Sequence, residues 1–331
     1  MQPRTLAHVT VACAALVAVA VLAVGVALFR TAPPRAALAR VEKASPPAAP
    51  PVASSVAGLP QPDRSHEIGR IDGAGSYSPL VDAIGGIVSE APTRSPGTEL
   101  GIAAMNLSTG EYAGWNDDTP FVSLSAAKVM WVAAAMLNGA KVDDIAPPIF
   151  VSSSNELAGV AIDRAGGIDT INSFYANVFN TKTTFCAKWR VGKLRHATEQ
   201  GSMGGDNYFV ARDVIKFLAK LDRGELLDKR TDELKRYMRL SPRQGLGGWL
   251  GTLLPAEARA RMMHKAGWDF SSADSSHTEI GIIEVPNGDH FAIAVLTRKG
   301  KKPEAEARYI EHASCAVYRG VARDASLRCR D

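Results

Sequence analysis

The hydrophobic residues of this chain follow three different patterns from one end to the other. The first is an unbroken apolar run over residues 9–29, which contain no charged side chain. As a helix this run is about 30 Å long, close to the thickness of the hydrocarbon core of a bilayer. Residues 1–30 are therefore predicted to be a transmembrane signal anchor, with a cleaved signal peptide as the alternative.

The second pattern is a segment with too few large apolar residues to form a core. Residues 31–62 hold eight of the 19 prolines, together with many Ala and Ser. This composition is typical of an extended linker. We expect the linker to cover residues 31–75 and a single folded domain to cover residues 76–325.

The third pattern, in the folded part, alternates between helical and strand periodicity. A helix is predicted to begin at Ser78-Pro79, and a β-hairpin follows at 100–115. A second hairpin is predicted at 279–296, after a possible strand at 261–268. Further helices are expected at 126–137, 156–165, 168–179, 210–221, 232–240, 246–254 and 303–318.

The order of these elements predicts an α+β fold. Strands from the two ends of the domain can share one antiparallel sheet flanked by helices, while the helices between them form a helical lobe. A cleft between the sheet and this lobe is where we expect a site.

The net charge of +4 is unevenly distributed. Residues 1–75 hold seven Lys or Arg and four Asp or Glu, so the rest of the chain is nearly neutral. Because affinity for phosphate backbones depends on clustered basic residues, nucleic acid is not expected as a partner.

The four cysteines do not form a C-x-x-C motif, so a redox or zinc-ribbon site is unsupported. Cys315 and Cys329 are close in sequence, and a disulfide between them is a hypothesis. Cys13 and Cys186 are further apart.

Ser125 and Lys128 are the first candidates for chemistry. They lie three positions apart at the start of an apolar helix, so the hydroxyl and the amine can meet on one face. An apolar environment lowers the pKa of a lysine and lets the neutral amine accept a serine proton. The alternative is that Ser125 only caps the helix and Lys128 is solvated.

Two further motifs follow. Ser153 and Asn155 stand at the start of a predicted helix, where they either bind substrate or merely cap the helix. Lys265 and Gly267 lie on a predicted strand, where glycine permits close approach of a substrate and lysine attracts an anion. The alternative is an exposed lysine followed by a bulge.

These motifs, in this order, resemble those of the penicillin-recognising serine hydrolases, and especially of class A β-lactamases. The resemblance covers about residues 76–322. Shorter matches are Gly101-Ile102, Thr109-Gly110-Glu111, Gly166-Gly167 and Leu254-Pro255-Ala256.

The resemblance implies a role for each motif residue. Ser125 would be the acylated nucleophile, Lys128 its general base or proton relay, and Ser153 the proton shuttle. Asn155 and the Lys265-Ala266-Gly267 strand would bind the substrate. The oxyanion hole would combine the N–H of Ser125 with one near Trp268 or Asp269, and neither a metal nor an organic cofactor is implied.

The sequence departs from the family pattern at three places. Ala266 replaces the Thr or Ser of the third motif, which removes a hydrogen bond to a charged group worth about 1.5–3 kcal/mol. Ser154 replaces the Asp of the second motif. The glutamate that activates the deacylating water is expected near residues 191–195, which hold no acid, so Glu199 is its candidate. The alternative for Glu199 is a solvated loop residue.

The resemblance therefore implies a serine hydrolase acting on a β-lactam through an acyl-enzyme. A D-alanyl-D-alanine carboxypeptidase or penicillin-binding protein, an esterase, and a catalytically weak cell-wall-binding protein are the alternatives. The expected substrate is a small molecule, either a β-lactam or a peptidoglycan-like peptide, and the protein is expected to be a monomer. We expect it to be anchored in the membrane through the N-terminal helix with an extracytoplasmic domain, or else secreted after signal cleavage.

Overall fold

The computed structural model describes residues 78–179, 188–190, 193–194, 207–270 and 274–323. The predicted anchor and linker lie outside these ranges, as does Glu199. Within the described ranges, no helix combines the length and the hydropathy of a membrane span.

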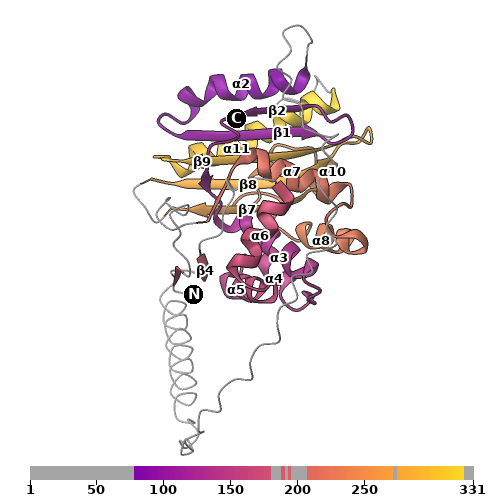
Figure 1. Ribbon diagram of the computed structural model, residues 1–331. Helices are drawn as coiled ribbons and strands as arrows, with labels where there is room; N and C mark the ends of the chain where they lie inside the picture. Colours follow the sequence, from indigo (N-terminus) through magenta and orange to yellow (C-terminus); the bar gives the residue numbers. More distant parts are fainter. Residues whose placement is uncertain (1–77, 180–187, 191–192, 195–206, 271–273, 324–331) are drawn as a thin grey trace, which may run out of the picture. The chain divides into compact units, whose positions relative to one another are not determined.

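A five-stranded antiparallel sheet forms the centre of the domain, with strand order β2-β1-β9-β8-β7 (Figure 1). The first hairpin, β1 and β2, thus shares one sheet with strands from the far end of the chain, as the sequence predicts, and β1 pairs directly with β9. The bounds are β1 Glu99–Asn106, β2 Tyr112–Trp115, β7 Met263–Asp269, β8 Ser276–Glu284 and β9 His290–Arg298.

The side chains on the two faces of this sheet pack into two separate hydrophobic cores. On β1, Ala103 and Met105 belong to the core of the helical lobe, whereas Ile102 and Ala104 face the other core. Because side chains of a strand alternate between faces, the nearly continuous apolar character of β1, β8 and β9 follows from burial on both sides.

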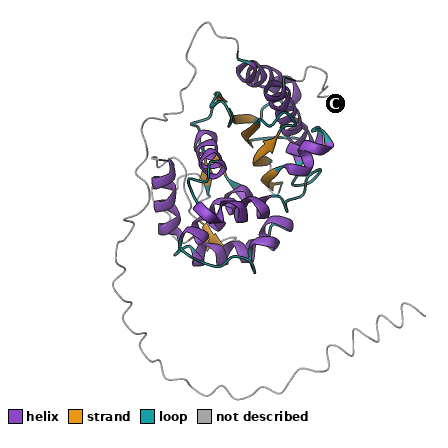
Figure 2. Cartoon of the chain, turned by 90° about the vertical axis from the view of Figure 1, so that its right-hand side faces the viewer, coloured by secondary structure: helices purple, strands orange, loops and turns teal. Residues whose placement is uncertain are grey.

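The rear face of the sheet is covered by α2 Pro79–Arg94 and α11 Pro303–Ala322, with the short helices α9 Trp249–Thr252 and α10 Ala256–Arg261 beside them. The Ser78 hydroxyl caps α2 by accepting the Val81 N–H at 3.2 Å, and Pro79 occupies the first turn. Figure 2 shows helices on either side of the strands.

The other face is covered by the helical lobe, which runs between β2 and β7 in sequence. Two short sheets accompany it, β3 Phe121–Val122 with β6 Tyr208–Phe209 and β4 Lys188–Arg190 with β5 Lys193–Leu194. Its helices are α3 Lys128–Leu137, α4 Ala146–Val151, α5 Asn155–Arg164, α6 Ile168–Phe179, α7 Ala211–Asp222 and α8 Thr231–Met238, with the 3₁₀ turns η2 Leu124–Ala127 and η4 Asp228–Arg230.

The predicted α+β fold is confirmed. The short strands β3, β4, β5 and β6 are not predicted, and three further elements differ. The helix expected at 246–254 is reduced to α9, because Gly245 and Gly247 adopt positive φ. The strand expected from residue 261 begins at Met263, because α10 continues to Arg261. The helix α4 is not predicted, since its Pro147-Pro148 pair reads as a breaker although proline suits a first helical turn.

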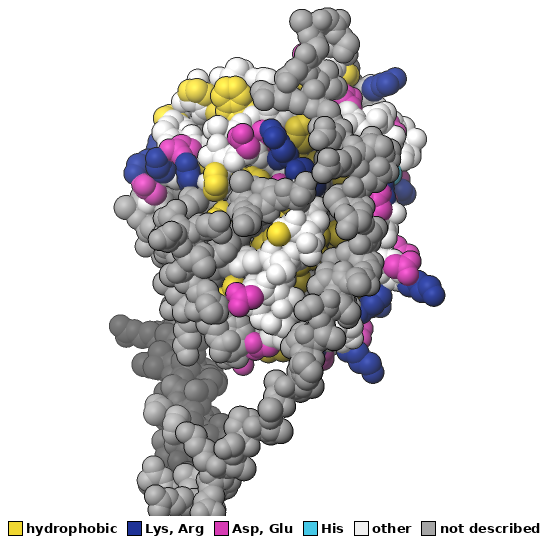
Figure 3. Space-filling model, in the orientation of Figure 1, with side chains coloured by type: hydrophobic (Ala, Val, Ile, Leu, Met, Phe, Trp, Pro, Cys, Tyr) yellow, Lys and Arg dark blue, Asp and Glu magenta, His cyan; other side chains and the backbone are white. Residues whose placement is uncertain are grey.

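Two outer features of the domain can be compared with the sequence. Cys315 is disulfide-bonded, and the other three cysteines lie outside the described residues. On the face shown in Figure 3, basic side chains stand beside acidic ones, in keeping with a nearly neutral domain.

Candidate active site

Ser125 lies on the turn η2 that leads into α3. A 3₁₀ turn places residues three apart directly above one another, so Ser125 and Lys128 share a face even more closely than in an α-helix. The preceding residue, Leu124, has a φ of 50°, a sparsely populated conformation for a branched side chain. The sequence predicts that Ser125 and Lys128 share one face of a turn, but it does not predict this strained entry to the turn.

Lys128 begins α3 and is almost completely buried, with 2% of its surface exposed. Its Nζ lies 2.6 Å from the carbonyl oxygen of Ser153, 3.0 Å from the Ser153 Oγ and 2.7 Å from the Asn155 Oδ1. The predicted motifs at 125–128 and 153–155 therefore meet in space through the lysine amine.

The environment of Lys128 favours the neutral amine. Burial and the positive charge of Lys265 lower the pKa of Lys128 to about 7. The Ser153 carbonyl and the Asn155 amide oxygen can only accept hydrogen bonds, so together they take the two N–H groups of a neutral amine. The third contact joins the amine to a hydroxyl, which is a contact across which a proton can pass.

The three residues at 153–155 have separate tasks. Ser153 has a φ of 56° and turns its hydroxyl to Lys128. Ser154 is the N-cap of α5, where its hydroxyl accepts the Leu157 N–H at 3.2 Å. Capping and site chemistry thus fall to adjacent serines, and Asn155, the first residue of α5, is exposed beside the site.

Lys265 reaches the same hydroxyl from the edge strand β7. Its Nζ lies 3.2 Å from the Ser153 Oγ and 2.7 Å from the Ala266 carbonyl oxygen, and its side chain is buried. Burial lowers the pKa of Lys265 to about 8, against the negative charge of Glu279, which raises it. The Lys265–Ser153 contact was not foreseen from the sequence, because it depends on how β7 packs against the lobe.

Gly267 lies directly against the backbone of the turn that carries Ser125. A Cβ at this position would be 2.3 Å from the Ser125 N and 2.6 Å from the Leu124 Cβ. Only glycine lets β7 pass this close, so the strand that carries Lys265 runs alongside the Ser125 N–H. This arrangement is what an oxyanion hole between the two segments requires.

Ala266 points away from the other candidates. Its methyl group is 1% exposed and belongs to the core behind the sheet, together with Leu250 and Ile293. Only its carbonyl oxygen contacts the site, through Lys265. The structure therefore brings together Ser125, Lys128, Ser153, Asn155, Lys265 and Gly267, whereas the Ala266 side chain lies elsewhere and Glu199 is outside the described residues.

A buried histidine–glutamate pair between β7 and β8 is not predicted from the sequence. His264 Nδ1 lies 2.7 Å from the Glu279 Oε1, and both side chains are fully buried. A lone acid at the start of the apolar stretch Ile280–Ile283 of β8 was the available signal, because a buried acid requires a partner.

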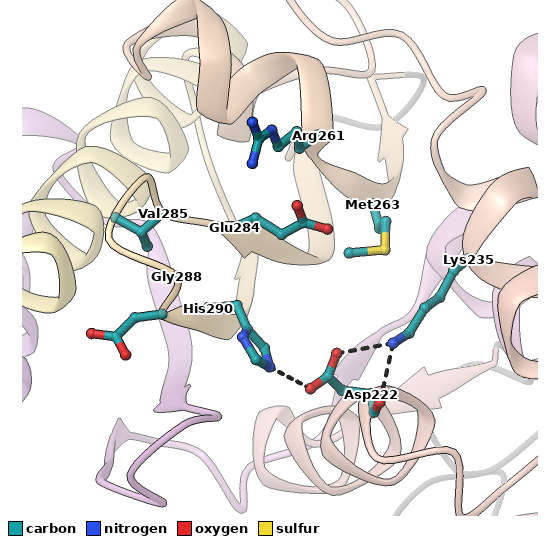
Figure 4. Close-up of a pocket in the computed structure, with 9 residues that line it drawn as sticks. Asp222, Lys235, Arg261, Met263, Glu284, Val285, Gly288 and His290 are labelled. Carbon is teal, nitrogen blue, oxygen red and sulfur yellow. Dashed lines mark hydrogen bonds and ion pairs between the residues drawn. The ribbon is translucent and has the colours of Figure 1, made fainter.

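A pocket of about 180 Å³ lies apart from these residues, lined by the end of α7, by α8 and by the β8–β9 turn (Figure 4). Within it, Asp222 accepts a hydrogen bond from the Lys235 Nζ at 3.0 Å and lies 2.6 Å from the His290 Nε2. The pairing of these charges joins the lobe to the sheet, and none of the predicted site residues lines the pocket. Among the described residues, no group of three or more His, Cys, Asp or Glu is placed to hold a metal ion.

The fold is that of a β-lactamase-like serine hydrolase, and its candidate site holds a serine and a buried lysine on one turn, a second serine between two lysines, and a glycine against the backbone of Ser125. The model of the beta-lactamase enzyme family matches residues 141–321, and the chain belongs to this family.

Solved structures support the same fold. A class A β-lactamase from Bacteroides cellulosilyticus is 20% identical, with a TM-score of 0.60 over 75% of this chain and 100% of that one. The TLA-3 extended-spectrum β-lactamase is 17% identical, with a TM-score of 0.62 over 73% and 99%. PBP-A is 20% identical, with a TM-score of 0.59 over 74% and 97%. No curated protein matches the chain.

Proposed function

We propose that this protein is a serine hydrolase that opens β-lactam amides through an acyl-enzyme at Ser125. The observation that carries the proposal is the position of Lys128. This residue begins the helix that follows the Ser125 turn, and its buried amine contacts Ser153 and Asn155. A lysine without a carboxylate partner is costly to bury as a cation, and such a group is suited to act as a base.

The proposed acylation uses three groups in sequence. Lys128 accepts the proton of the Ser125 hydroxyl while the Ser125 Oγ forms a bond to the amide carbon. The developing oxyanion is held at the Ser125 N–H, beside Gly267. The amide C–N bond then breaks, and the nitrogen takes the proton of Ser153, which Lys128 replenishes across their 3.0 Å contact.

The substrate is proposed to carry a carboxylate near the reacting amide. Lys265 supplies positive charge within reach of Ser153, and Asn155 offers an amide group at the exposed rim. Because Ala266 has no hydroxyl, recognition of the carboxylate depends more heavily on Lys265 than in sites with a Thr or Ser at this position.

Release of the acyl group distinguishes two functions. A β-lactamase needs a base that activates water, and Glu199 is the candidate for that role. A penicillin-binding D-alanyl peptidase would keep the penicilloyl ester and turn over on a peptide. The second function is favoured by Ala266 and by the lack of an acid at residues 191–195. One similar structure is a PBP-A mutant described as an acyl-enzyme complex with penicillin G.

The test is to mix the full chain with a chromogenic cephalosporin and with penicillin G, and to follow both turnover and intact mass. Steady hydrolysis that disappears in Ser125→Ala supports the β-lactamase. A lasting adduct at Ser125 with little turnover supports the peptidase, which is then assayed on a D-alanyl-D-alanine peptide. If Ser125 gains mass from neither β-lactam, the proposal fails and esters become the next substrates.

Attachment to the membrane is a separate proposal. Its support is the uncharged run at residues 9–29, followed by a proline-rich segment. Protease added to intact cells should remove the catalytic domain if the domain is extracytoplasmic, and a domain protected until the membrane is broken would contradict this location.

A further inference from the structure

Lys128 and Lys265 are close enough for the charge of one to disfavour the charge of the other. The structure also contains a group that can determine which of the two amines stays protonated. Lys128 and Lys265 both contact the Ser153 Oγ, at 3.0 and 3.2 Å. Two ammonium groups around one buried hydroxyl repel each other. Lys128 can act as a base only when it is neutral, and Lys265 can bind an anion only when it is charged. The site therefore requires that Lys128 lose its proton while Lys265 keeps its own.

Glu279 lies immediately behind Lys265. On β8 it pairs with Ala266, the residue next to Lys265, and its carboxylate is fully buried. One carboxylate oxygen accepts the Leu250 N–H at 3.1 Å and the other contacts the His264 Nδ1 at 2.7 Å. These hydrogen bonds from two elements fix the carboxylate behind the strand that carries Lys265.

The hydrogen bonds of the buried pair favour a neutral imidazole. The His264 Nε2 is buried without a hydrogen-bond partner among the described residues. A protonated imidazole would leave an N–H donor unsatisfied there, whereas the neutral ring with its proton on Nδ1 leaves only a bare acceptor. This pattern favours a neutral His264 that donates its Nδ1–H to Glu279 and adds no positive charge beside the carboxylate.

The charged groups around Lys265 come from three directions. Across the site, Lys128 on α3 repels it. Behind the strand, Glu279 attracts it, and its effect is to raise the pKa of Lys265. Farther back on α11, Glu311 interacts with both Glu279 and Arg308.

We propose that Glu279, fixed by His264 and Leu250, is a positioning residue that keeps the proton on Lys265 and so leaves Lys128 as the neutral base. This inference rests on the proposed function and adds a residue that touches neither substrate nor nucleophile. It also explains how a site with Ala266 in place of a hydroxyl retains an anion-binding cation at the pH at which Lys128 is neutral.

The chain contains a matched control for this proposal. His277 and Glu306 form a second buried pair, 2.9 Å apart at Nδ1 and Oε2, and the His277 Nε2 likewise has no partner among the described residues. Glu306 also accepts hydrogen bonds from the hydroxyls of Ser275 and Thr297. Glu279→Gln and Glu306→Gln thus remove the same charge from comparable pairs, only one of which adjoins Lys265.

The first test measures protonation directly and needs no substrate. The full chain is labelled with ¹³Cε-lysine, the signals of Lys128 and Lys265 are assigned with Lys128→Arg and Lys265→Arg, and the titration is followed by NMR. In Glu279→Gln we expect the Lys265 titration to move down by about one pH unit, and in Glu306→Gln we expect no movement. An unchanged Lys265 titration in a folded Glu279→Gln protein overturns the proposal, and so does an equal movement in Glu306→Gln.

The second test measures acylation of Ser125 by penicillin G against pH. The alkaline limb of the profile should move to lower pH in Glu279→Gln, stay in place in Glu306→Gln, and return towards its original position in Glu279→Asp. If the wild-type chain is not acylated at all, the proposed function fails, while the NMR titration still decides the role of Glu279. If Glu279→Gln does not fold, Glu279→Asp carries the comparison. Drawing the carboxylate back by one methylene should lower the Lys265 titration midpoint by less than one pH unit, and an unchanged midpoint would overturn the proposal.

Discussion

Lys128 and Lys265 approach one hydroxyl from opposite sides, 3.0 and 3.2 Å from the Ser153 Oγ. One lysine comes from the first turn of α3 and the other from an edge strand at the far end of the domain. The chemistry of the site therefore depends on three segments that are distant in sequence, and each of them can be tested separately.

Replacing Lys128 by Met should separate its role in chemistry from its role in the fold. Met is similar in length and apolar, so acylation should fall by about 10²–10⁴-fold, the usual contribution of a general base. The fold should become more stable at pH 7, because a buried amine is removed. The pKa of Lys128 falls from 10.5 to about 7 on burial, so wild-type stability rises with pH across this range and the advantage of Lys128→Met should shrink. Thermal unfolding at pH 7 and pH 9.5 measures both effects, and a less stable Lys128→Met protein at pH 7 would argue that Lys128 is a structural cation.

The pH dependence of acylation should be bell-shaped. The rate should rise as Lys128 loses its proton near pH 7 and fall as Lys265 loses its proton near pH 8. Lys265→Arg keeps a permanent positive charge, so it should abolish the alkaline limb and leave the acid limb in place. Single-turnover acylation between pH 5.5 and 9.5 measures the profile, and an alkaline limb that persists in Lys265→Arg must belong to another group.

Replacing Gly267 by Ala should misplace the oxyanion site. The new methyl group would stand 2.3 Å from the Ser125 N, so β7 or the turn must move. We expect acylation to fall by about 10²–10³-fold, as for loss of an oxyanion donor. Gly85→Ala is the control, since Gly85 is exposed in the middle of α2 and a Cβ there would meet no atom within 4 Å, and this change should raise stability by up to about 1 kcal/mol. Equal acylation rates in the two variants would rule out Gly267 as part of the oxyanion site.

Ser153 combines a strained backbone with a reactive hydroxyl, and two substitutions separate them. Its φ of 56° suits glycine. Ser153→Gly and Ser153→Ala should therefore lose acylation to a similar degree, because both lack the hydroxyl. Ser153→Gly should nevertheless unfold at a higher temperature than Ser153→Ala. Acylation retained in either variant would show that another group protonates the leaving nitrogen.

The sequence predicts the local elements that carry the candidate residues, and these elements are found where expected. The spacing of Ser125 and Lys128 places them on one turn, and the 153–155 motif starts a helix. The contacts between motifs could not be derived in the same way, because the Lys265–Ser153 hydrogen bond depends on how the edge strand packs against the lobe.

The sequence does not predict the surroundings of Lys265, Ala266 and Glu279, because these depend on how the strands pack. Ala266 and Lys265 are neighbours on a strand, yet one side chain enters the rear core and the other enters the site, because side chains alternate along a strand. Glu279 reads as an ordinary acid until β8 is paired with β7, which places Glu279 opposite Ala266. The roles of the candidate residues and the limits of the domain remain predictions, as does any part played by Glu199.

The strand order β2-β1-β9-β8-β7 has a consequence for how the protein folds. Ser125 precedes the helices of the lobe in sequence, and Lys265 on β7 follows them. The two residues therefore come together only when distant parts of the chain are in contact. Contacts of this kind form late in folding, because the entropy of closing a long loop is lost before the contacts can stabilise the structure. Reactivity of Ser125 during refolding should therefore lag behind the return of helical signal and report the completion of the native sheet.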